Sequence, residues 1–416
     1  MDFRLPLELR MLQETARRFT EEELMPLERE AIENEMKRGM DTVPYRPAPG
    51  AHHVFDPDGI ISVEKYQHLS TRARELGLWG LDVPAELGGV DIGVLGKNMV
   101  LEETHRCLVP FILPPDSPNL HWMMAVCTPE QRELYLEPYA RGEISSCLAV
   151  SEPGAGADAS NIRTKATRTA NGWLLNGRKT WVSRADWCDF IIVLARTDSG
   201  TKPGEGVSAF LVDRNAPGVT IERRIATMGA DRPCEISFEN VELQELHVLG
   251  KVGGAFKELQ NRFSVRRIEI AIRSLAASER LLSLLVAQAN NRETFGAKLA
   301  DRQAIQWWIA DAQAEIHAVR LMCYHAAWKI DNGIRDVRYE ASMLKVKATE
   351  MAAKVADWTI QAHGGMGLAK EMPIEFFYRM ARYWRIVEGP SEVHRMVVAR
   401  NRLKGQVPTI DPDHIR

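Results

Sequence analysis

Val387-Glu388-Gly389-Pro390-Ser391 lies near the C-terminus, shortly after the glycine-rich segment Gln361-Ala362-His363-Gly364-Gly365-Met366-Gly367. It places one carboxylate beside a conformationally free glycine. A carboxylate can remove a proton from a carbon acid when it is held close to the carbon, away from water, with its pKa raised toward neutrality. Glu388 is therefore the first candidate for a catalytic base.

Two segments far upstream of Glu388 are typical of a site for a flavin dinucleotide. They are Ser151-Glu152-Pro153-Gly154-Ala155-Gly156-Ala157-Asp158 and Trp181-Val182-Ser183. Gly154 and Gly156 leave a loop whose backbone amides can approach a cofactor closely. Trp181 can cover a flat ring, and the Ser183 hydroxyl can reach a ring heteroatom. No G-x-G-x-x-G segment opens a helix after a strand, so a Rossmann site is not expected. The alternative is that Trp181 is a core aromatic after a hairpin and the glycines form an ordinary turn.

The hydrophobic pattern divides the chain into three parts. Residues 1–143 show helical spacing, for example around Leu9, Leu12, Ala16 and Phe19, and residues 144–252 show the shorter period of strands. In this middle part, Asn176-Gly177 between two apolar runs predicts a hairpin turn. Residues 253–416 return to helical spacing and predict long antiparallel helices that form a bundle.

Three apolar faces in the last part support the bundle, and two segments are expected to be irregular. The faces consist of Ile268, Ile272, Leu275, Leu282, Leu285 and Ala289; of Ile305, Trp308, Ile309, Ala312 and Ile316; and of Leu344, Ala348, Met351, Val355 and Trp358. Met40 to Asp58 is rich in Pro, Gly and His and predicts a long excursion. The tail 404–416 is also expected to be irregular.

Composition excludes several classes of function. The 416 residues are 45% hydrophobic and 26% charged, with a net charge of −3, so nucleic acid is not an expected partner. The six cysteines include no CxxC pair and no nearby metal-type histidine spacing, so neither a disulfide scaffold nor a metal site is expected. We expect no signal peptide, transit peptide or membrane span, and a cytoplasmic location.

The order and spacing of these motifs resemble the acyl-CoA dehydrogenase family from about residue 5 to residue 404. The resemblance implies an N-terminal α-helical domain (1–143), a middle β-barrel or sandwich domain (144–252) and a C-terminal four-helix bundle (253–416). It implies FAD as cofactor. The positions that resemble the family's cofactor contacts are Leu148, Val150, Ser151, Ala157, Trp181, Ser183, Arg292, Thr294, Phe295, Gln303, Gln361, Gly364, Gly365, Pro390 and Glu392.

Several of these cofactor positions imply an oligomer. Arg292-Glu293-Thr294-Phe295-Gly296 resembles a motif through which Arg292 and Phe295 reach the flavin of a neighbouring subunit. The segment from Gln361 to Gly365 resembles one that receives the pyrophosphate across a subunit boundary. The resemblance therefore implies a homo-oligomer, a dimer or a tetramer.

For the reaction, the resemblance implies α,β-dehydrogenation of an acyl-CoA to a 2-enoyl-CoA. Glu388 stands where the family's base takes the α-proton, while the β-hydrogen leaves as hydride to flavin N5. The Glu388 amide would help bind the thioester oxygen, a type of contact worth roughly 3–4 kcal/mol in oxyanion sites. Some relatives carry the base at the position of Arg266, and arginine cannot act as a base. The positions that resemble substrate or CoA contacts are Ala157, Ser264, Arg266, Arg267, Gly389 and Arg400.

Three positions depart from the commonest family pattern. Ala157 replaces a serine that contacts CoA, and Pro390 and Glu392 replace a threonine and a glutamine near the adenine half of the flavin. The segment G-P-S-E-V-H resembles a branch of the family that reads G-P-x-E-V-H.

Two residues near the base bear on the acyl group. Val387 is small where many relatives are aromatic, and Arg266 adds a charge. We therefore expect an acyl group that is bulky, branched or cyclic, or that carries a polar substituent. In the alternative, Arg266 pairs with a nearby acid or contacts CoA.

The resemblance leaves other activities to be weighed. An electron-transfer flavoprotein is the expected electron acceptor, whereas an acyl-CoA oxidase on the same fold would use oxygen. A non-catalytic assembly or scaffold protein that retained the fold is an alternative of a different class. The retention of Glu388, Trp181, Arg292 and Gln361 argues against the scaffold.

Overall fold

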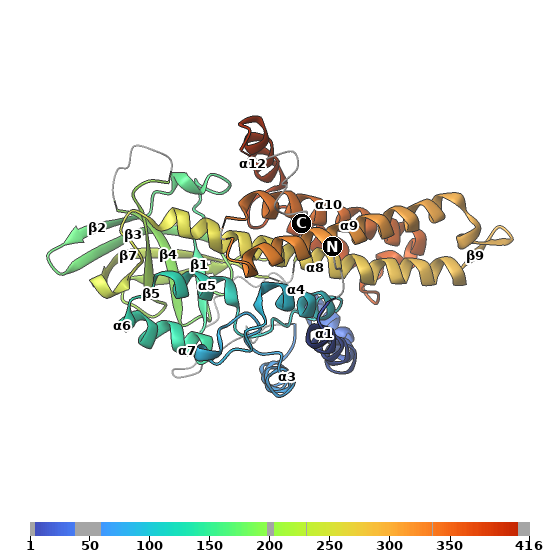
Figure 1. The fold of residues 1–416 in the computed structure, drawn as a ribbon, viewed down its shortest axis with the longest axis horizontal. Helices are drawn as coiled ribbons and strands as arrows, with labels where there is room; N and C mark the ends of the chain where they lie inside the picture. The colour runs from blue at the N-terminus through green and yellow to red at the C-terminus, as the bar shows by residue number, and fades with distance from the viewer. Residues whose placement is uncertain (1–4, 38–59, 198–203, 230, 335, 407–416) are drawn as a thin grey trace. The chain divides into compact units, whose positions relative to one another are not determined.

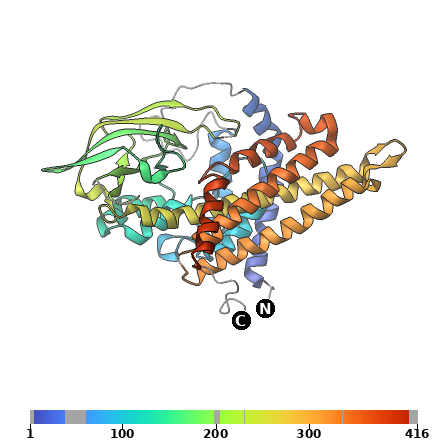
Figure 2. The same cartoon turned by 90° about the horizontal axis from the view of Figure 1, so that it is seen from above.

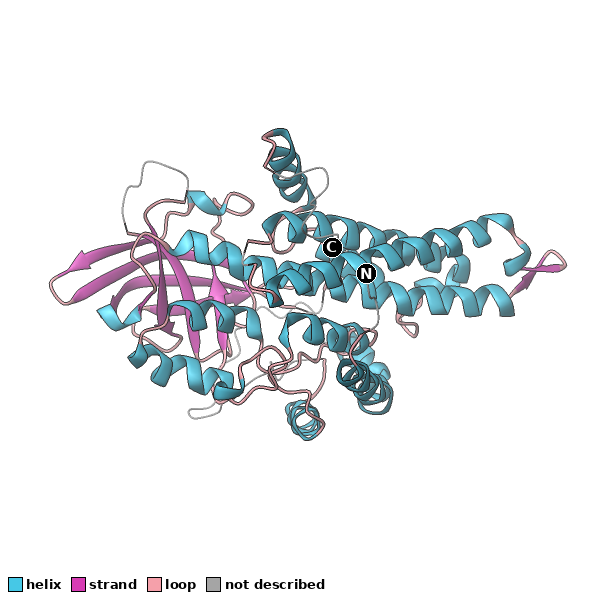
Figure 3. Ribbon diagram, viewed as in Figure 1, coloured by secondary structure: helices cyan, strands magenta, loops and turns pink. Residues whose placement is uncertain are grey.

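The computed structural model describes residues 5–37, 60–197, 204–229, 231–334 and 336–406. The chain divides into two compact units. A bundle unit comprises Met1–Ile32, Ile92–Val109 and Ser264–Arg416, and a sheet unit comprises Glu33–Asp91 and Pro110–Phe263. Along the chain, helices are followed by strands and then by helices again, as predicted (Figure 3). The boundaries 143 and 252 stay a prediction. The predicted excursion Met40 to Asp58 and the residues after 406 lie outside the described part.

The bundle unit is built on three long helices, α8 (Ala255–Asn291), α9 (Gln303–Asp331) and α10 (Arg338–His363), which Figures 1 and 2 show side by side. Most of α8 belongs to this unit. The unit also contains α1 (Leu7–Phe19), η1 (Thr20–Leu24), η2 (Met25–Leu27), the start of α2 (Glu28–Lys37), α4 (Gly93–Thr104), β9 (Glu293–Thr294), β10 (Ala297–Lys298), η7 (Leu299–Asp301), η8 (Gly364–Leu368), α11 (Ile374–Trp384) and α12 (Ser391–Leu403).

The predicted apolar faces meet inside this unit. All six residues predicted on α8, from Ile268 to Ala289, are buried. The Thr359 hydroxyl donates to the Leu281 carbonyl at 3.3 Å, and the Gln288 amide donates to the Ala362 carbonyl at 3.4 Å, so α10 lies along the second half of α8. Helix α9 packs against α10 and α4. Burying an apolar side chain of this size contributes about 1.5–3 kcal/mol, which makes these faces the main source of the unit's stability.

The sheet unit holds eight strands and several short helices. The strands are β1 (Ser146–Ala149), β2 (Lys165–Thr169), β3 (Gly172–Val182), β4 (Phe190–Arg196), β5 (Val207–Asp213), β6 (Val219–Arg224), β7 (Cys234–Leu243) and β8 (Val248–Leu249). The helices are α3 (Val63–Glu75), η3 (Ala85–Leu87), α5 (Ser117–Val126), α6 (Pro129–Gln131), η4 (Arg132–Leu136), α7 (Glu137–Ala140), η5 (Ala159–Asn161) and η6 (Glu245–His247). The strand order is β6-β7-β3-β2-β4-β5-β8, and β1 pairs with β4 in parallel.

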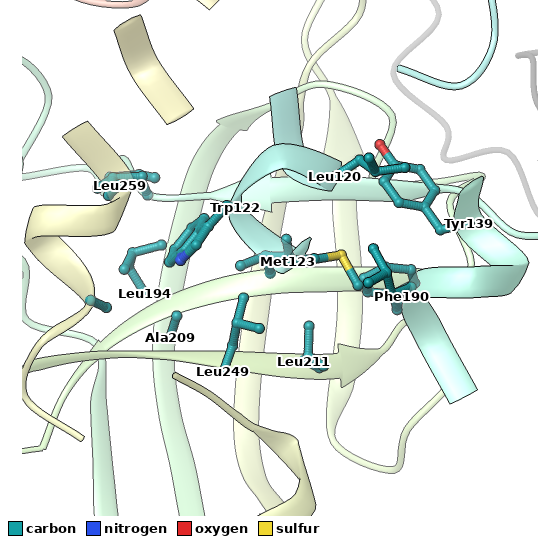
Figure 4. Packing of buried hydrophobic residues seen from close by; sticks show 14 of the residues in the cluster. Leu120, Trp122, Met123, Tyr139, Phe190, Leu194, Ala209, Leu211, Leu249 and Leu259 are labelled. Atoms are coloured by element: carbon teal, nitrogen blue, oxygen red, sulfur yellow. The ribbon is translucent and has the colours of Figure 1, made fainter. Parts of the chain in front are cut away.

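Strand β4 divides the core of the sheet unit into two layers. Phe190, Ile192 and Leu194 enter one cluster, and the alternate residues Ile191, Val193 and Ala195 enter another. Because successive side chains of a strand point to opposite faces, a strand covered on both sides reads as a continuous apolar run. Figure 4 shows the first cluster, where α5 and α7 contribute Trp122, Met123 and Tyr139 against Phe190 and Leu194.

The predicted hairpin at Asn176-Gly177 is wrong. Both residues lie inside β3, and the pairing of β3 with β7 shifts register between Leu175 and Gly177, as at a β-bulge. The hairpin between β2 and β3 turns instead at Ala170-Asn171, where Thr169 pairs with Gly172. Of the second Asn-Gly pair, Asn171 lies in the turn and Gly172 is the first residue of β3. No helix in the described part of the chain has the length and apolar character that a membrane span requires.

Candidate functional site

Glu388 lies in the turn between α11 and α12 of the bundle unit, in a left-handed backbone conformation. Its φ is 53°, and that of Gly389 is 95°. The left-handed region is natural for glycine, but a glutamate pays about 1–3 kcal/mol to occupy it. Backbone strain of this kind persists only where surrounding contacts determine the conformation, and it is common at functional sites.

Three side chains from three helices hold the two carbonyl oxygens of this turn. Arg267 of α8 donates through Nε to the Glu388 carbonyl at 3.2 Å, and His394 of α12 donates through Nε2 to the same oxygen at 3.2 Å. Lys345 of α10 donates through Nζ to the Gly389 carbonyl at 2.5 Å. We refer to Arg267, Lys345 and His394 as the carbonyl clamp.

The protonation state of His394 follows from its surroundings. Burial, together with the charges of Arg267 and Lys345, lowers the pKa of His394 to about 3, so the ring is neutral near pH 7. A carbonyl oxygen can only accept, so the proton must be on Nε2. Nδ1 then accepts from the Ser342 hydroxyl at 3.2 Å, and Ser342 on α10 thereby selects the tautomer.

Lys345 is a second perturbed group beside the base. The side chain is fully buried, and burial is the main reason that its pKa falls to about 7. The charge of Arg267 lowers the pKa of Lys345 further, while Glu388 and Glu392 oppose the change. An amine with this pKa titrates near neutral pH and remains a hydrogen-bond donor in both states.

Arg266, next in the chain to Arg267, is paired with an acid. It donates through Nη1 to Glu269 at 2.7 Å, and Lys97 of α4 donates through Nζ to the other oxygen of Glu269 at 2.5 Å. All three side chains are largely buried. Two cations on one carboxylate give the group a formal charge of +1.

Of the other predicted substrate residues, Ala157 belongs to the sheet unit, and the rest are spread over the bundle unit. Ser264 is buried on α8, and Gly389 lies in the base turn. Arg400 is exposed on α12, Pro390 is the N-cap of α12, and Glu392 is exposed in its first turn. The structure thus brings Arg267 and Gly389 to Glu388.

The flavin-type loop of the sheet unit, from Ser151 to Asp158, is anchored by a buried ion pair. Lys179 of β3 donates through Nζ to Glu152 at 2.8 Å and to the Val150 carbonyl at 2.9 Å. Glu152 also accepts from the backbone N–H groups of Arg163 and Thr164. Burial lowers the pKa of Lys179 to about 8 against the opposing effect of Glu152. These contacts tie the loop to β3 and leave its tip exposed.

Trp181 lies at the end of β3 beside this loop. The Thr180 N–H donates to the Ser151 carbonyl at 2.9 Å, so the predicted residues around Ser151 and Trp181 are neighbours. Trp181 has a φ of 61° and is 59% exposed, which excludes a core role in this unit. Ser183 and Leu148 are partly exposed, Val150 is buried and Ala157 is exposed.

The loop has the properties that a flavin dinucleotide requires. A Cβ added at Gly154 or Gly156 would meet nothing within 4 Å, so the backbone there is open to a ligand. An exposed indole and a hydroxyl lie beside this open backbone. The residues present therefore fit the isoalloxazine end of a flavin, with backbone donors, a flat apolar wall and a polar side chain.

The remaining predicted cofactor residues gather at the far end of α8–α10. Arg292 directly follows the end of α8, Thr294 and Phe295 lie in the β9–β10 hairpin, and Gln303 begins α9. Phe295 is 100% exposed, and the hairpin is labelled at the tip of the long helices in Figure 1. Gln361, Gly364 and Gly365 are exposed at the end of α10, and added Cβ atoms at both glycines would meet nothing within 4 Å.

Sequence reasoning missed four residues that organise these sites. Lys345 and His394 hold the base turn, and Lys179 and Glu152 hold the flavin-type loop. The signal for Lys345 was present, because the helical spacing places this lysine on one face with Ala341, Ala348 and Ala352. Among the described residues, no group of three or more His, Cys, Asp or Glu side chains could hold a metal.

Three family models match consecutive parts of the chain. They are the acyl-CoA dehydrogenase N-terminal domain at residues 49–143, the middle domain at 147–241 and the C-terminal domain at 255–403. The (R)-benzylsuccinyl-CoA dehydrogenase of Thauera aromatica is 44% identical over 409 residues, covering 97% of each chain.

Solved structures agree with these matches. A glutaryl-coenzyme A dehydrogenase in complex with glutaryl-CoA is similar with a TM-score of 0.83 at 26% identity, over 97% of both chains. The butyryl-CoA dehydrogenase of Megasphaera elsdenii is similar with a TM-score of 0.82 at 27% identity, over 97% of this chain and 100% of that one.

Proposed function

Because the chain belongs to the acyl-CoA dehydrogenase family of FAD-dependent oxidoreductases, we propose that it oxidises an acyl-CoA thioester to the 2-enoyl-CoA with Glu388 as the base. The observation that carries the proposal is the clamped, left-handed turn that presents this one carboxylate. A strained backbone costs free energy of folding, and such strain is found mainly where the position of a side chain matters for function.

The chain's own residues divide the work of this reaction. Glu388 takes the α-proton of the thioester, and its backbone N–H donates to the thioester oxygen, where negative charge develops. FAD, when bound, would supply the acceptor for the β-hydrogen and its electron pair, and loss of both hydrogens would leave a carbon–carbon double bond. In the sheet unit, Trp181 and Ser183 would orient the ring, and the open backbone at Gly154 and Gly156 would approach the cofactor.

We propose a substrate whose acyl group carries a second carboxylate and a bulky substituent. The relative from Thauera aromatica is named for benzylsuccinyl-CoA, which has both features. The cluster of Lys97, Arg266 and Glu269 would favour an anionic acyl group, since Arg266 can exchange part of its pairing with Glu269 for the substrate carboxylate. Val387 leaves room beside the base.

An anaerobic titration tests the base and the substrate class together. The oxidised protein is titrated separately with benzylsuccinyl-CoA, glutaryl-CoA and butyryl-CoA. The flavin absorbance at about 450 nm is followed. We expect bleaching by the aryl-substituted diacid thioester, and loss of bleaching in Glu388→Gln. Bleaching that persists in Glu388→Gln would exclude Glu388 as the base.

The role of Arg266 is tested by the ranking of acidic and neutral thioesters. Arg266→Gln should lower kcat/KM for the acidic thioester by about 10–100-fold and leave the neutral one little changed. Arg280→Gln is the matched control, because Arg280 lies on the same helix and pairs with Glu28. An unchanged ranking in Arg266→Gln would contradict the proposed charge recognition.

We further propose an electron-transfer flavoprotein as the acceptor and a homo-oligomer as the active form. The full exposure of Phe295 at the β9–β10 hairpin leaves this side chain accessible to a neighbouring subunit, as the resemblance to the family implies. Reoxidation of the reduced protein by air distinguishes the acceptors, since an oxidase would reoxidise rapidly with oxygen alone.

A further inference from the structure

Two consecutive carbonyl groups in the base turn receive three hydrogen bonds from side chains of three different helices. The Glu388 oxygen accepts from Arg267 and His394, and the Gly389 oxygen accepts from Lys345. Lys345 and His394 are 0% and 1% exposed, and Arg267 is 9% exposed. Buried donors of this kind need acceptors, so the turn and the helices depend on each other.

The direction of a carbonyl determines where the neighbouring side chain points. Fixing the Glu388 oxygen fixes the peptide plane that follows the Glu388 Cα, and fixing the Gly389 oxygen fixes the next plane, so together they restrict the backbone rotations that set the Cα–Cβ direction of Glu388. Without these donors, a glutamate would relax from φ 53° toward the commoner right-handed or extended regions. Such a change would swing the carboxylate away from its present position.

We propose that Lys345 and His394 are positioning residues that, with Arg267, lock the Glu388-Gly389 carbonyl groups and so aim the Glu388 carboxylate at the substrate α-carbon. The inference rests on the proposed function, in which Glu388 is the base. It adds a role for two residues that act on Glu388 through the backbone of the base turn. Ser342 contributes indirectly, because its hydroxyl keeps the His394 proton on Nε2.

The test measures the rate of flavin reduction by stopped flow in Lys345→Met and His394→Phe. Each substitution removes a hydrogen-bond donor and replaces it with an apolar side chain of similar size. We expect the rate to fall about 10–100-fold, since a misplacement of about 1 Å can cost 100-fold. FAD content and the Kd for enoyl-CoA product should stay within about twofold of the parent protein.

An isotope effect separates positioning from general damage. When proton removal becomes slower, α-dideuterated substrate should show a larger isotope effect on flavin reduction in both variants than in the parent protein. His394→Gln, which keeps a side-chain N–H donor, should recover part of the lost rate. Lys329→Met is the control, because Lys329 of α9 is also a buried lysine, at 8% exposed, but its amine donates to the Glu340 carboxylate and not to the base turn.

The outcomes distinguish this inference from the proposed function. If Glu388→Gln abolishes flavin reduction while Lys345→Met and His394→Phe reduce flavin at the parent rate, the positioning role of the carbonyl clamp is overturned. The role of Glu388 as the base is then retained. If Glu388→Gln keeps the parent rate, the base itself is wrong. Equal rate losses in Lys329→Met and Lys345→Met, with an unchanged isotope effect, would also overturn the clamp. Should His394→Phe fail to fold, Ser342→Ala removes only the partner of Nδ1 and must show the same increase in isotope effect.

Discussion

Gly389 illustrates how one residue type can be required by its neighbours. Its φ of 95° lies in the region that side chains rarely adopt, and an added Cβ would lie 3.1 Å from His394 Nε2. That nitrogen is already committed to the Glu388 carbonyl. Position 389 therefore faces two separate restrictions, one from its own backbone and one from the carbonyl clamp.

Gly389→Ala should lower activity more than stability. Backbone strain costs about 1 kcal/mol, and displacement of His394 should reduce the rate of flavin reduction by at least about tenfold. Gly405→Ala is the control, because Gly405 also has a positive φ of 65° but an added Cβ there meets nothing within 4 Å. Thermal unfolding and stopped-flow reduction are compared for both variants. Equal activity in the two variants would show that the contact with His394 is unimportant.

The buried neutral ring of His394 should make the protein sensitive to acid. The unfolded chain binds a proton at this residue below about pH 6.5, whereas the folded state resists protonation until about pH 3. The neutral His394 therefore contributes its full share to the free energy of unfolding above about pH 6.5. This contribution is lost as the pH falls toward 3, with a slope of up to about 1.4 kcal/mol per pH unit. In urea unfolding between pH 7 and pH 4, the free energy of unfolding of His394→Gln should fall less steeply with pH than that of the parent protein. Parallel curves would contradict this assignment.

At the scale of elements, strand β3 shows why local signals can mislead. Asn176-Gly177 has the composition of a hairpin turn, yet β3 continues through it because β2 and β7 pair on both sides. Gly177 has a φ of 152° and lies against Thr164 at the bulge. The glycine allows β3 to approach the chain at Thr164 closely. Composition alone cannot distinguish a glycine required for close approach from a glycine required for a turn.

Gly177→Ala should destabilise the sheet unit by about 2–4 kcal/mol. An added Cβ would lie 2.5 Å from Thr164 Oγ1 and 2.7 Å from Thr164 Cα, and the backbone atom cannot easily move away. Gly333→Ala, with a φ of 81° and open space around the added Cβ, should cost only about 1 kcal/mol. Chemical denaturation of both variants makes the comparison. A Gly177→Ala variant as stable as Gly333→Ala would contradict the proposed collision.

At the scale of the whole molecule, each unit is assembled from segments that are distant in sequence. Helices α1 and α4 belong to the same unit as α8–α12. Asp331 at the end of α9 accepts from the backbone N–H groups of Val94 and Leu95, and so caps the start of α4. Glu103 on α4 accepts from Gln13 and Arg17 on α1. Helix α4 is buried on nearly every side, which explains its weak amphipathic pattern.

Assembly into an oligomer should be needed to retain FAD. Phe295→Ala and Arg292→Ala are expected to weaken FAD binding by at least about tenfold, because both residues are expected to reach the flavin of a neighbouring subunit. Light scattering gives the mass and the flavin absorbance gives the FAD content of each variant. Arg302→Ala is a control in the same hairpin region, where Arg302 donates to the Thr294 carbonyl. Full FAD content in a monomeric protein would contradict the prediction.

The sequence alone was sufficient for the helix–sheet–helix order and for six of the buried positions of α8, while the roles of the motifs around Glu388, Trp181 and Phe295 stay predictions. These features depend on local periodicity and on residue types that are needed whatever their distant neighbours. Tertiary structure decided the bulge at Gly177, the grouping of α1 and α4 with the last helices, and the carbonyl clamp. Each of these depends on which distant segments meet, and a sequence pattern contains no record of the partner across the contact.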